Sequence, residues 1–428
     1  MLIRAAVLAT LDPPRAEPGE LRVEGDRIGE RGARLQPRPG EEVLDAGLVM
    51  PGLVNAHTHL YSALARGMPA PDAPPRTFVE VLERVWWRLD RALDEDSVRL
   101  SALVGAIEAA RSGTTLLVDH HASPGFIHGS LSVVRAAVES VGLRAVLCYE
   151  TTDRHGREGA RAGIGENAAF AREVDGAPLT RAATGAHAGF TLEDETLDAL
   201  ADAVRATGAG LHVHVAEDRA DVDDSRARHG CGLIERYARH GLLGPRSLLA
   251  HAVHLTPEEL AQAQDAGAWL LHNPRSNMNN AVGAAATRHF RRAALGTDGM
   301  DQDLLAEARA AFLKMREAGR DDAYGAALAL LAGGQRLARE VFGLPFGTLE
   351  PGAPADLVLF DYRPPTPLHA GNLAGHLLFG LDRSHVHTVI VAGRCVLRAR
   401  EIEGVDEADV LARAAPAAAA LWERMRRL

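Results

Sequence analysis

The stretch Pro51-Gly52-Leu53-Val54-Asn55-Ala56-His57-Thr58-His59-Leu60 is an apolar run that ends in a His-x-His pair. On a β-strand, side chains two residues apart point to the same face. His57 and His59 can therefore bind one metal ion while Thr58 points away. A single His-x-His pair is a weak indication, because a catalytic zinc-type site needs about three protein ligands and an open position for water. Further ligands have to come from the ends of other strands.

Downstream of this stretch, apolar strand-like runs alternate with helical segments, which is typical of a parallel sheet with crossover helices. Eight candidate strands end near His59, Asp119, Glu150, His187, Glu217, His254, Pro274 and Asp298. Asp94 and Thr256 are placed to cap two of the helices between them. We therefore predict an α/β fold of the (β/α)8 TIM-barrel type.

The two ends of the chain carry short apolar alternations separated by Pro- and Gly-rich turns, which read as strands of a small β unit. We predict a β-sandwich built from both chain ends. Its N-terminal part covers residues 1–50 and its C-terminal part covers residues 347–405. The metal-dependent barrel covers residues 51–346, and a C-terminal helix covers residues 406–428.

The composition is that of an ordinary globular chain, with 428 residues, 46% hydrophobic and 24% charged. A net charge of -10 disfavours nucleic acid and anionic membranes as partners. The three cysteines form no Cys-x-x-Cys pair, so neither a disulfide framework nor a thiolate metal site is indicated. No apolar run approaches the roughly 18 residues of a membrane span, and the N-terminus lacks a signal-like region. We expect a cytoplasmic protein with no membrane partner.

In an eight-stranded α/β barrel, the reacting groups lie at the C-terminal ends of the strands. The fifth candidate strand ends in His214-Val215-Ala216-Glu217, which adds a third imidazole and a carboxylate. The eighth ends in Gly296-Thr297-Asp298-Gly299, where flanking glycines allow a tight turn and leave Asp298 free to reach the ion or its water. Glu217 is expected near the reaction but off the metal.

The chain resembles the amidohydrolase superfamily, in the branch of cytosine, guanine and S-adenosylhomocysteine deaminases and triazine hydrolases. The resemblance covers nearly the whole chain and rests on the His-x-His stretch and on His214-Val215-Ala216-Glu217, Ala250-His251, Asn273-Pro274-Arg275-Ser276-Asn277 and Gly296-Thr297-Asp298. Segments 86–95, 119–124 and 150–154 further resemble the SsnA group of aminohydrolases.

The resemblance implies that one divalent metal is bound by His57, His59, His214 and Asp298. Zinc is the expected metal, with iron and manganese as alternatives. Glu217 would protonate or hydrogen-bond a ring nitrogen of the substrate, and His251 would hold the attacking water and the developing tetrahedral oxygen. A zinc-type ion lowers the pKa of its water toward about 7, and Asp298 is placed to take that proton and pass it to leaving ammonia.

The lysine content indicates how many metals are bound. Binuclear members of the superfamily bridge two metals with a carboxylated lysine on the fourth strand. Here that strand, residues 183–187, ends in His187, and the only lysine is Lys314 in a helical stretch. We therefore expect a single metal.

The candidate substrate-binding residues are His187, His121, Asn273 and Trp86. Each has a plainer structural interpretation: a structural role for His187, core packing for the pair Trp86 and Trp87, turn chemistry for Asn273 and Asn277, and capping or packing for His120 and His121. His212 is expected deeper on the strand, as a hydrogen-bonded core histidine.

A carboxyl group at position 217 favours a deaminase over simple amide hydrolases, because hydrolysis at an N–C=N carbon needs acid at the ring nitrogen. We predict release of ammonia from a purine, pyrimidine or related N-heterocycle. Alternatives are a triazine chlorohydrolase or N-alkylaminohydrolase, a cyclic amide hydrolase, or a barrel that has lost catalysis and binds a partner. The partner is a small-molecule heterocyclic substrate, and the resemblance is compatible with a homodimer.

Overall fold

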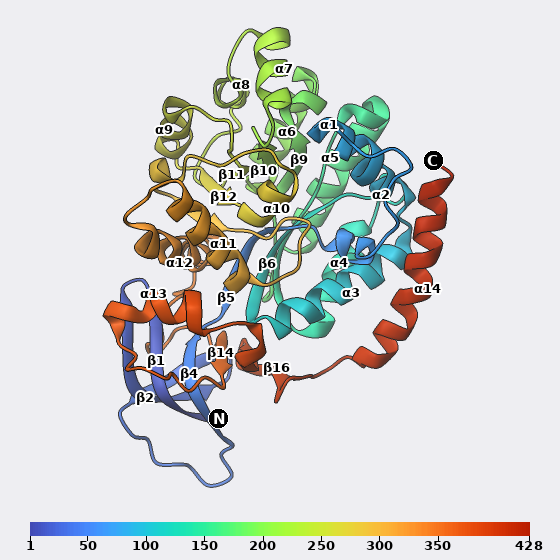
Figure 1. Cartoon of the computed structure of the whole chain (residues 1–428). Helices are drawn as coiled ribbons and strands as arrows, with labels where there is room; N and C mark the ends of the chain where they lie inside the picture. The colour runs from blue at the N-terminus through green and yellow to red at the C-terminus, as the bar shows by residue number, and fades with distance from the viewer.

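Two parallel sheets form the centre of the computed structural model, which describes residues 1–428 (Figure 1). One sheet has the order β5-β6-β7-β8 and the other the order β13-β12-β11-β10-β9. Their bounds are β5 Leu53–Thr58, β6 Thr114–His121, β7 Arg144–Tyr149, β8 Thr180–Ala182, β9 Thr184–Ala188, β10 Leu211–Val215, β11 Leu248–His251, β12 Trp269–His272 and β13 Ala293–Leu295.

Isolated bridges connect the two sheets. Thr58 at the end of β5 pairs in parallel with Asp298, just after β13, and Thr151 after β7 pairs in parallel with Ala186 in β9. The segments β8 and β9 are separated only by Ala183. The carboxyl ends of strands from both sheets therefore lie close together, where the predicted site residues are placed.

Helices follow the strands and cover them from outside. Their bounds are α3 Glu95–Arg111, α4 Ser130–Val141, α5 Gly156–Glu173, α6 Asp194–Thr207, α7 Arg219–His229, α8 Leu233–Arg239, α9 Pro257–Asp265, α10 Pro274–Asn279, α11 Leu304–Glu317 and α12 Ala323–Phe342. Two predicted helix starts are confirmed, since Asp94 and Thr256 each form a capping box with the residue three positions later. Each such cap contributes about 1 kcal/mol to stability.

A broken helical segment precedes α3. It consists of α1 (Phe78–Val81), one π-helical turn over residues 82–86, and α2 (Trp87–Ala92). Residues 78–92 therefore form an irregular helix. A π-helical turn changes the direction of side chains within a helix and is frequent at functional sites. This segment supplies aromatic side chains to the cavity described below.

The two ends of the chain share one sheet of eight strands, with the order β17-β16-β15-β14-β4-β1-β2-β3. The bounds are β1 Leu2–Leu11, β2 Pro14–Glu24, β3 Arg27–Gly32, β4 Val43–Pro51, β14 Leu357–Phe360, β15 Val386–Val391, β16 Arg394–Arg398 and β17 Glu401–Ile402. Because β14 pairs antiparallel with β4, the ends meet directly, as expected. These strands form one continuous sheet, so the two-layered sandwich stays a prediction.

The C-terminal helix α14 (Glu407–Arg426) lies along the outside of the molecule (Figure 1). The short α13 (Leu373–Gly375) lies near the end-built sheet. The indole of Trp422 donates to the carbonyl of Leu64 at 2.9 Å, and Arg424 Nε donates to the carbonyl of Ala92 at 2.7 Å. Helix α14 thus packs on residues before α2 and on the C-terminal end of α2. No helix in the structure is both long and apolar enough to cross a membrane.

A buried ion pair joins the end-built sheet to β7. The guanidinium of Arg144 donates two hydrogen bonds to the carboxylate of Asp356, at 2.7 and 3.1 Å, and both side chains are almost fully buried. Asp356→Asn leaves a buried, uncompensated arginine, so we expect it to lower the free energy of unfolding by about 3–5 kcal/mol. Urea unfolding checks this result.

The matched control is Glu235→Gln, which removes an exposed pair with Arg239. That change is expected to cost about 1 kcal/mol or less, because exposed ion pairs contribute little. Equal stability losses in the two variants would show that the Arg144–Asp356 pair does not join the two parts of the molecule as described.

Candidate metal centre and active site

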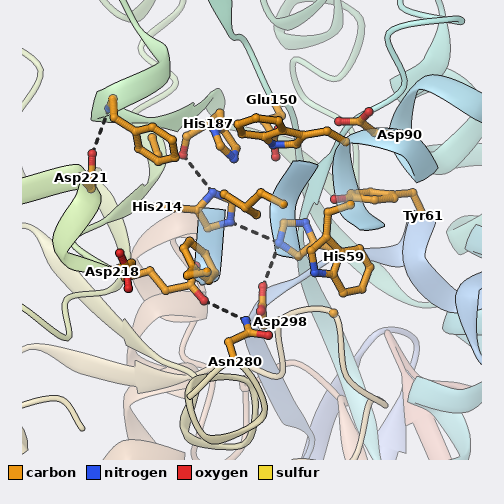
Figure 2. Close-up of a pocket in the computed structure, with 18 residues that line it drawn as sticks. His59, Tyr61, Asp90, Glu150, His187, His214, Asp218, Asp221, Asn280 and Asp298 are labelled. Carbon is orange, nitrogen blue, oxygen red and sulfur yellow. Dashed lines mark hydrogen bonds and ion pairs between the residues drawn. The ribbon is translucent and has the colours of Figure 1, made fainter. Parts of the chain in front are cut away.

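The four predicted ligands lie together at the carboxyl ends of the strands. His57 and His59 come from the end of β5, His214 from β10, and Asp298 follows β13. Their ligand atoms all lie within 4.8 Å of one another. Asp298 Oδ1 is 3.2 Å from His57 Nε2 and 2.9 Å from His59 Nε2, and the Nε2 atoms of His59 and His214 are 3.2 Å apart. Figure 2 shows the contacts of His59 with His214 and with Asp298.

Hydrogen bonds hold each imidazole by its other nitrogen. His59 Nδ1 donates to the carbonyl of His120 at 2.7 Å, and His214 Nδ1 donates to the carbonyl of His187 at 2.9 Å. His57 Nδ1 is 2.9 Å from Nε2 of the fully buried His212. His212 is therefore a hydrogen-bonded core histidine, as predicted. These contacts fix the ring orientations and leave three Nε2 atoms for one ion.

The residues fit a divalent metal. His57 Nε2 is buried and has no hydrogen-bond partner, although it faces the carboxylate of Asp298. The second oxygen of that carboxylate accepts from the hydroxyl of Ser276, which orients it. Three imidazole nitrogens and one carboxylate oxygen are ligands that zinc prefers. A cation at this point would bind the imidazole nitrogens and the carboxylate oxygen that converge there.

Left-handed backbone conformations cluster at the same place. Ala216, His251 and Asp298 have φ values of 49°, 72° and 55°. Such conformations cost non-glycine residues about 1–3 kcal/mol each, and they are found where the surrounding structure holds a functional group in place. The neighbouring Gly296 packs so tightly that a Cβ would lie 2.7 Å from the carbonyl oxygen of His57. The glycine expected before Asp298 is thus required by close packing.

Glu217 and His251 lie beside the ligands. Glu217 Oε2 is 3.5 Å from His251 Nε2, and Glu217 Oε1 accepts from the amide of Asn280 at 3.1 Å. His251 Nδ1 donates to Asn277 Oδ1 at 2.8 Å, so its Nε2 faces the site without a partner. Burial raises the pKa of Glu217. A carboxyl group with a raised pKa holds its proton more readily, as a general acid must.

A cavity adjoins this cluster, and the broken helical segment supplies part of its lining. Phe78, Leu82, Trp86 and Trp87 line it together with His59, His214, Glu217 and Asp298. Among the predicted substrate contacts, His187 and Trp86 line this cavity. The other two, His121 and Asn273, do not. His121 is engaged with the hydroxyl of Ser123, and Asn273 is buried beside His251, so their predicted contact with substrate gains no support.

Other residues of the cavity were not predicted as site residues. Glu150 follows β7 and Asp90 lies in α2, and Arg154 holds both: its Nη2 is 2.9 Å from Glu150 Oε1 and 3.3 Å from Asp90 Oδ2. Burial raises the pKa of Asp90 to about 7. Burial acts in the same direction on Glu150, but His187, His120 and Arg154 outweigh it and hold the pKa of Glu150 below its usual range. Its position at the end of a predicted strand is the feature of the sequence that could have identified Glu150 as a site residue.

The single-metal expectation rests on the absence of a lysine at the strand ends. Lys314 lies in α11 and pairs with Glu317 on the same helix. It therefore lies outside the strand ends, and no lysine is available to bridge two metals. The fourth strand instead ends at His187, whose Nδ1 contacts the hydroxyl of Thr191 at 2.7 Å.

Comparison with known proteins agrees with this geometry. Residues 48–396 match the amidohydrolase family. The chain is 32% identical to a 5-methylthioadenosine/S-adenosylhomocysteine deaminase of Moorella thermoacetica, over 96% of this chain and 97% of that protein. It is 30% identical to a 5'-deoxyadenosine deaminase of Methanosarcina mazei, over 99% of each.

Solved structures show the same architecture. A zinc-bound adenosine deaminase from Xanthomonas campestris superimposes with a TM-score of 0.85 at 25% identity, over 100% of this chain and 98% of that one. Zinc-bound atrazine chlorohydrolase TrzN from Arthrobacter aurescens gives a TM-score of 0.81 at 22% identity, over 97% and 99% of the two chains, and shows likeness of fold alone. The protein is thus an enzyme with a divalent-metal site, and the chain belongs to the amidohydrolase family.

Proposed function

We propose that this enzyme is a mononuclear deaminase that releases ammonia from a purine, pyrimidine or related N-heterocycle, with zinc as its metal. The observation that carries the proposal is the buried Glu217 beside the ligand cluster, because hydrolysis of a simple amide does not need an acid at a ring nitrogen. The relatives named above as adenosine-type deaminases support the same reaction class.

The proposed roles follow from the positions of the side chains. When bound to His57, His59, His214 and Asp298, a divalent ion supplies Lewis-acid chemistry and an activated water. His251 Nε2 carries no proton when Nδ1 donates to Asn277, so it can accept a hydrogen bond from the attacking water.

Two carboxyl groups would move the protons. Asp298 takes a proton from the attacking water, and Ser276 holds its other oxygen in place. Glu217 gives a proton to the ring nitrogen next to the reacting carbon, and Asn280 fixes the position of its carboxyl group. Asp298 then returns its proton to the amino group, which leaves as ammonia, and the proton of the added hydroxyl group returns to Glu217 as the carbonyl forms. His187 and Trp86 are the proposed substrate contacts, since both line the cavity.

The proposal also includes the fold, the cellular compartment and the oligomeric state. We infer that the two parallel sheets form a (β/α)8 barrel, supported by the bridges at Thr58 and Thr151. The three cysteines are all free, which suits a reducing cytoplasm. A homodimer remains an expectation, and size-exclusion chromatography with light scattering tests it. The triazine and cyclic amide alternatives have no observation in this site that favours them over deamination.

Ammonia release from the zinc-loaded protein tests the proposal. The panel contains aminopurines, aminopyrimidines, aminotriazines and the matching nucleosides, with chloride and alkylamine release followed in parallel. We expect ammonia from at least one aminoheterocycle, and we expect loss of the activity on chelation and its return with zinc. Chloride or alkylamine release without ammonia from any compound would contradict deamination and favour the triazine-type reaction.

A further inference from the structure

We propose that a second cavity, on the back of α10, binds a small organic anion, and that α10 transmits this binding to the side chains around the metal centre. The cavity lies between α10, α11 and residues 283–288, and it shares no lining residue with the active-site cavity. Its volume is about 330 Å³, within the range of about 300–1,000 Å³ that is typical of ligand pockets. The inference concerns a separate site and does not rest on the proposed deaminase function.

The lining of this second cavity is positively charged. Its charged side chains are those of Arg288, Lys314 and Arg320, and it contains no carboxylate. The chain as a whole carries a net charge of -10, so the cavity differs in sign from the rest of the molecule. A cleft lined by charges of one sign raises the local concentration of ions of the opposite sign. The occupant that fits this cavity is therefore an anion.

Two of these three cations are available to a ligand. Arg288 is exposed and forms no hydrogen bond or ion pair within the protein. Lys314, the only lysine of the chain, pairs with Glu317 at the surface, and exposed pairs of this kind contribute little to stability. Arg320 differs, because it donates to both carboxylate oxygens of Asp322, at 2.6 and 2.7 Å. We therefore assign the anionic group of the ligand to Arg288 and Lys314.

A buried histidine and an apolar wall complete the cavity. His272 ends β12 and is 5% exposed, neither of its ring nitrogens has a partner in the protein, and Nδ1 is fully enclosed. Burial lowers the pKa of His272 to about 3, and a neutral imidazole with its proton on Nε2 can donate to an oxyanion. Pro274, Met278, Ala311 and Met315 supply apolar surface. The ligand is thus expected to carry an apolar body beside its carboxylate or phosphate group.

Helix α10 carries side chains that hold the proposed catalytic groups. Three polar residues in or directly after this helix each hold one of them: Ser276 donates to Asp298, Asn277 Oδ1 accepts from His251 Nδ1 at 2.8 Å, and Asn280 donates to Glu217 Oε1 at 3.1 Å. One short helix therefore sets the positions of all three groups.

The same helix also forms part of the second cavity. Pro274 and Met278 line it, and Asn277 lines it as well as holding His251. Close-packed protein interiors transmit small displacements, so a ligand that packs against Pro274 and Met278 is expected to shift α10. The side chains that α10 holds at the metal centre would move with it.

Calorimetric titration of the zinc-loaded protein at low salt tests the binding site. The probes are benzoate, phenyl phosphate and benzamide, which is the neutral counterpart of benzoate. We expect at least one of the two anions to bind about tenfold or more tightly than benzamide, and its affinity to fall as salt is added. The tighter anion identifies the anionic group of the ligand as a carboxylate or a phosphate.

Variants of the lining locate the bound anion. The double variant Arg288→Gln/Lys314→Gln is expected to weaken anion binding by about tenfold or more, and Ala285→Glu, which adds a carboxylate to the lining, by a similar factor. These variants keep all the proposed metal ligands, so an anion bound to zinc would keep its affinity. Arg161→Gln on the exposed face of α5 is the control and is expected to change nothing. Thermal unfolding and zinc content show whether each variant is folded and loaded.

Cobalt-loaded protein reports the coupling without a substrate, because Ser276 orients the proposed ligand Asp298. We expect the tighter anion to change the visible absorption of the wild type and of Arg161→Gln. The midpoint of this change is expected at a concentration at least about tenfold higher in the double variant. No spectral change in the wild type, or an unchanged midpoint in the double variant, would overturn the coupling, since the latter result means that the anion binds cobalt directly.

The binding outcomes are independent of the proposed deaminase function. Equal binding of benzamide, an unchanged affinity in the double variant and in Ala285→Glu, or no binding of either anion overturns the site. None of these measurements depends on ammonia release. A protein that binds the anion as expected but releases no ammonia from any compound would count against deamination alone.

Discussion

The Asp298→Asn variant is expected to lose at least about three orders of magnitude in kcat/KM, together with much of its bound metal. The change removes the negative charge that faces His57 and His59, at 3.2 and 2.9 Å, and with it the proposed proton acceptor. Steady-state ammonia release and elemental analysis of the same preparation measure both effects.

Asp321→Asn is the matched control for this experiment. Asp321 is fully exposed, and the change removes only its ion pair with Arg316, whose atoms are 3.9 Å apart. We expect wild-type activity and metal content from it. An Asp298→Asn protein that keeps more than about a tenth of its activity would show that Asp298 carries no proton in the reaction.

The Glu217→Gln variant is expected to lose about 10²–10⁴-fold in kcat while it keeps its metal. Glu217 lies outside the group of His57, His59, His214 and Asp298, so its charge is not needed to hold the ion. Glutamine can still accept from Asn280 but cannot deliver a proton to a ring nitrogen. Steady-state kinetics with metal analysis of the same sample checks the separation.

A second surface variant controls for the chemistry of this substitution. Glu258→Gln changes an exposed glutamate at the start of α9 and is expected to leave kcat unchanged. Full activity in Glu217→Gln would remove the reason for preferring a deaminase over the amide-hydrolysing alternative. Loss of metal in that variant would mean that Glu217 is a ligand, contrary to the proposed role.

The candidate metal centre could be predicted because its proposed ligands lie at positions that a parallel sheet brings together. His57 and His59 end one strand, and His214 and Asp298 end or follow two others. Their Nε2 and carboxylate atoms meet once the strands are aligned, whatever the helices between them do. His212 was also predictable, since a residue two positions before a ligand lies on the same face of the strand.

The part of the cavity lining formed by Glu150 and Asp90 could not be predicted in the same way. Asp90 belongs to an irregular helical segment, and no periodicity indicates which of its side chains face the cavity. Glu150 ends a predicted strand, but its surroundings depend on contacts that the sequence does not indicate. It pairs with Arg154, which also pairs with Asp90 in α2. The predicted roles of His121 and Asn273 relied on their positions near strand ends, whereas local bonds to Ser123 and packing beside His251 place them outside the cavity.

Titration of the metal-free protein with zinc, with ammonia release measured at each point, tests the central claim most directly. We predict that activity rises in proportion to bound zinc and reaches its maximum at one ion per chain, bound by the group of His57, His59, His214 and Asp298. Ammonia release from protein shown by elemental analysis to be metal-free, or a requirement for two ions per chain, would contradict a mononuclear metal-dependent deaminase.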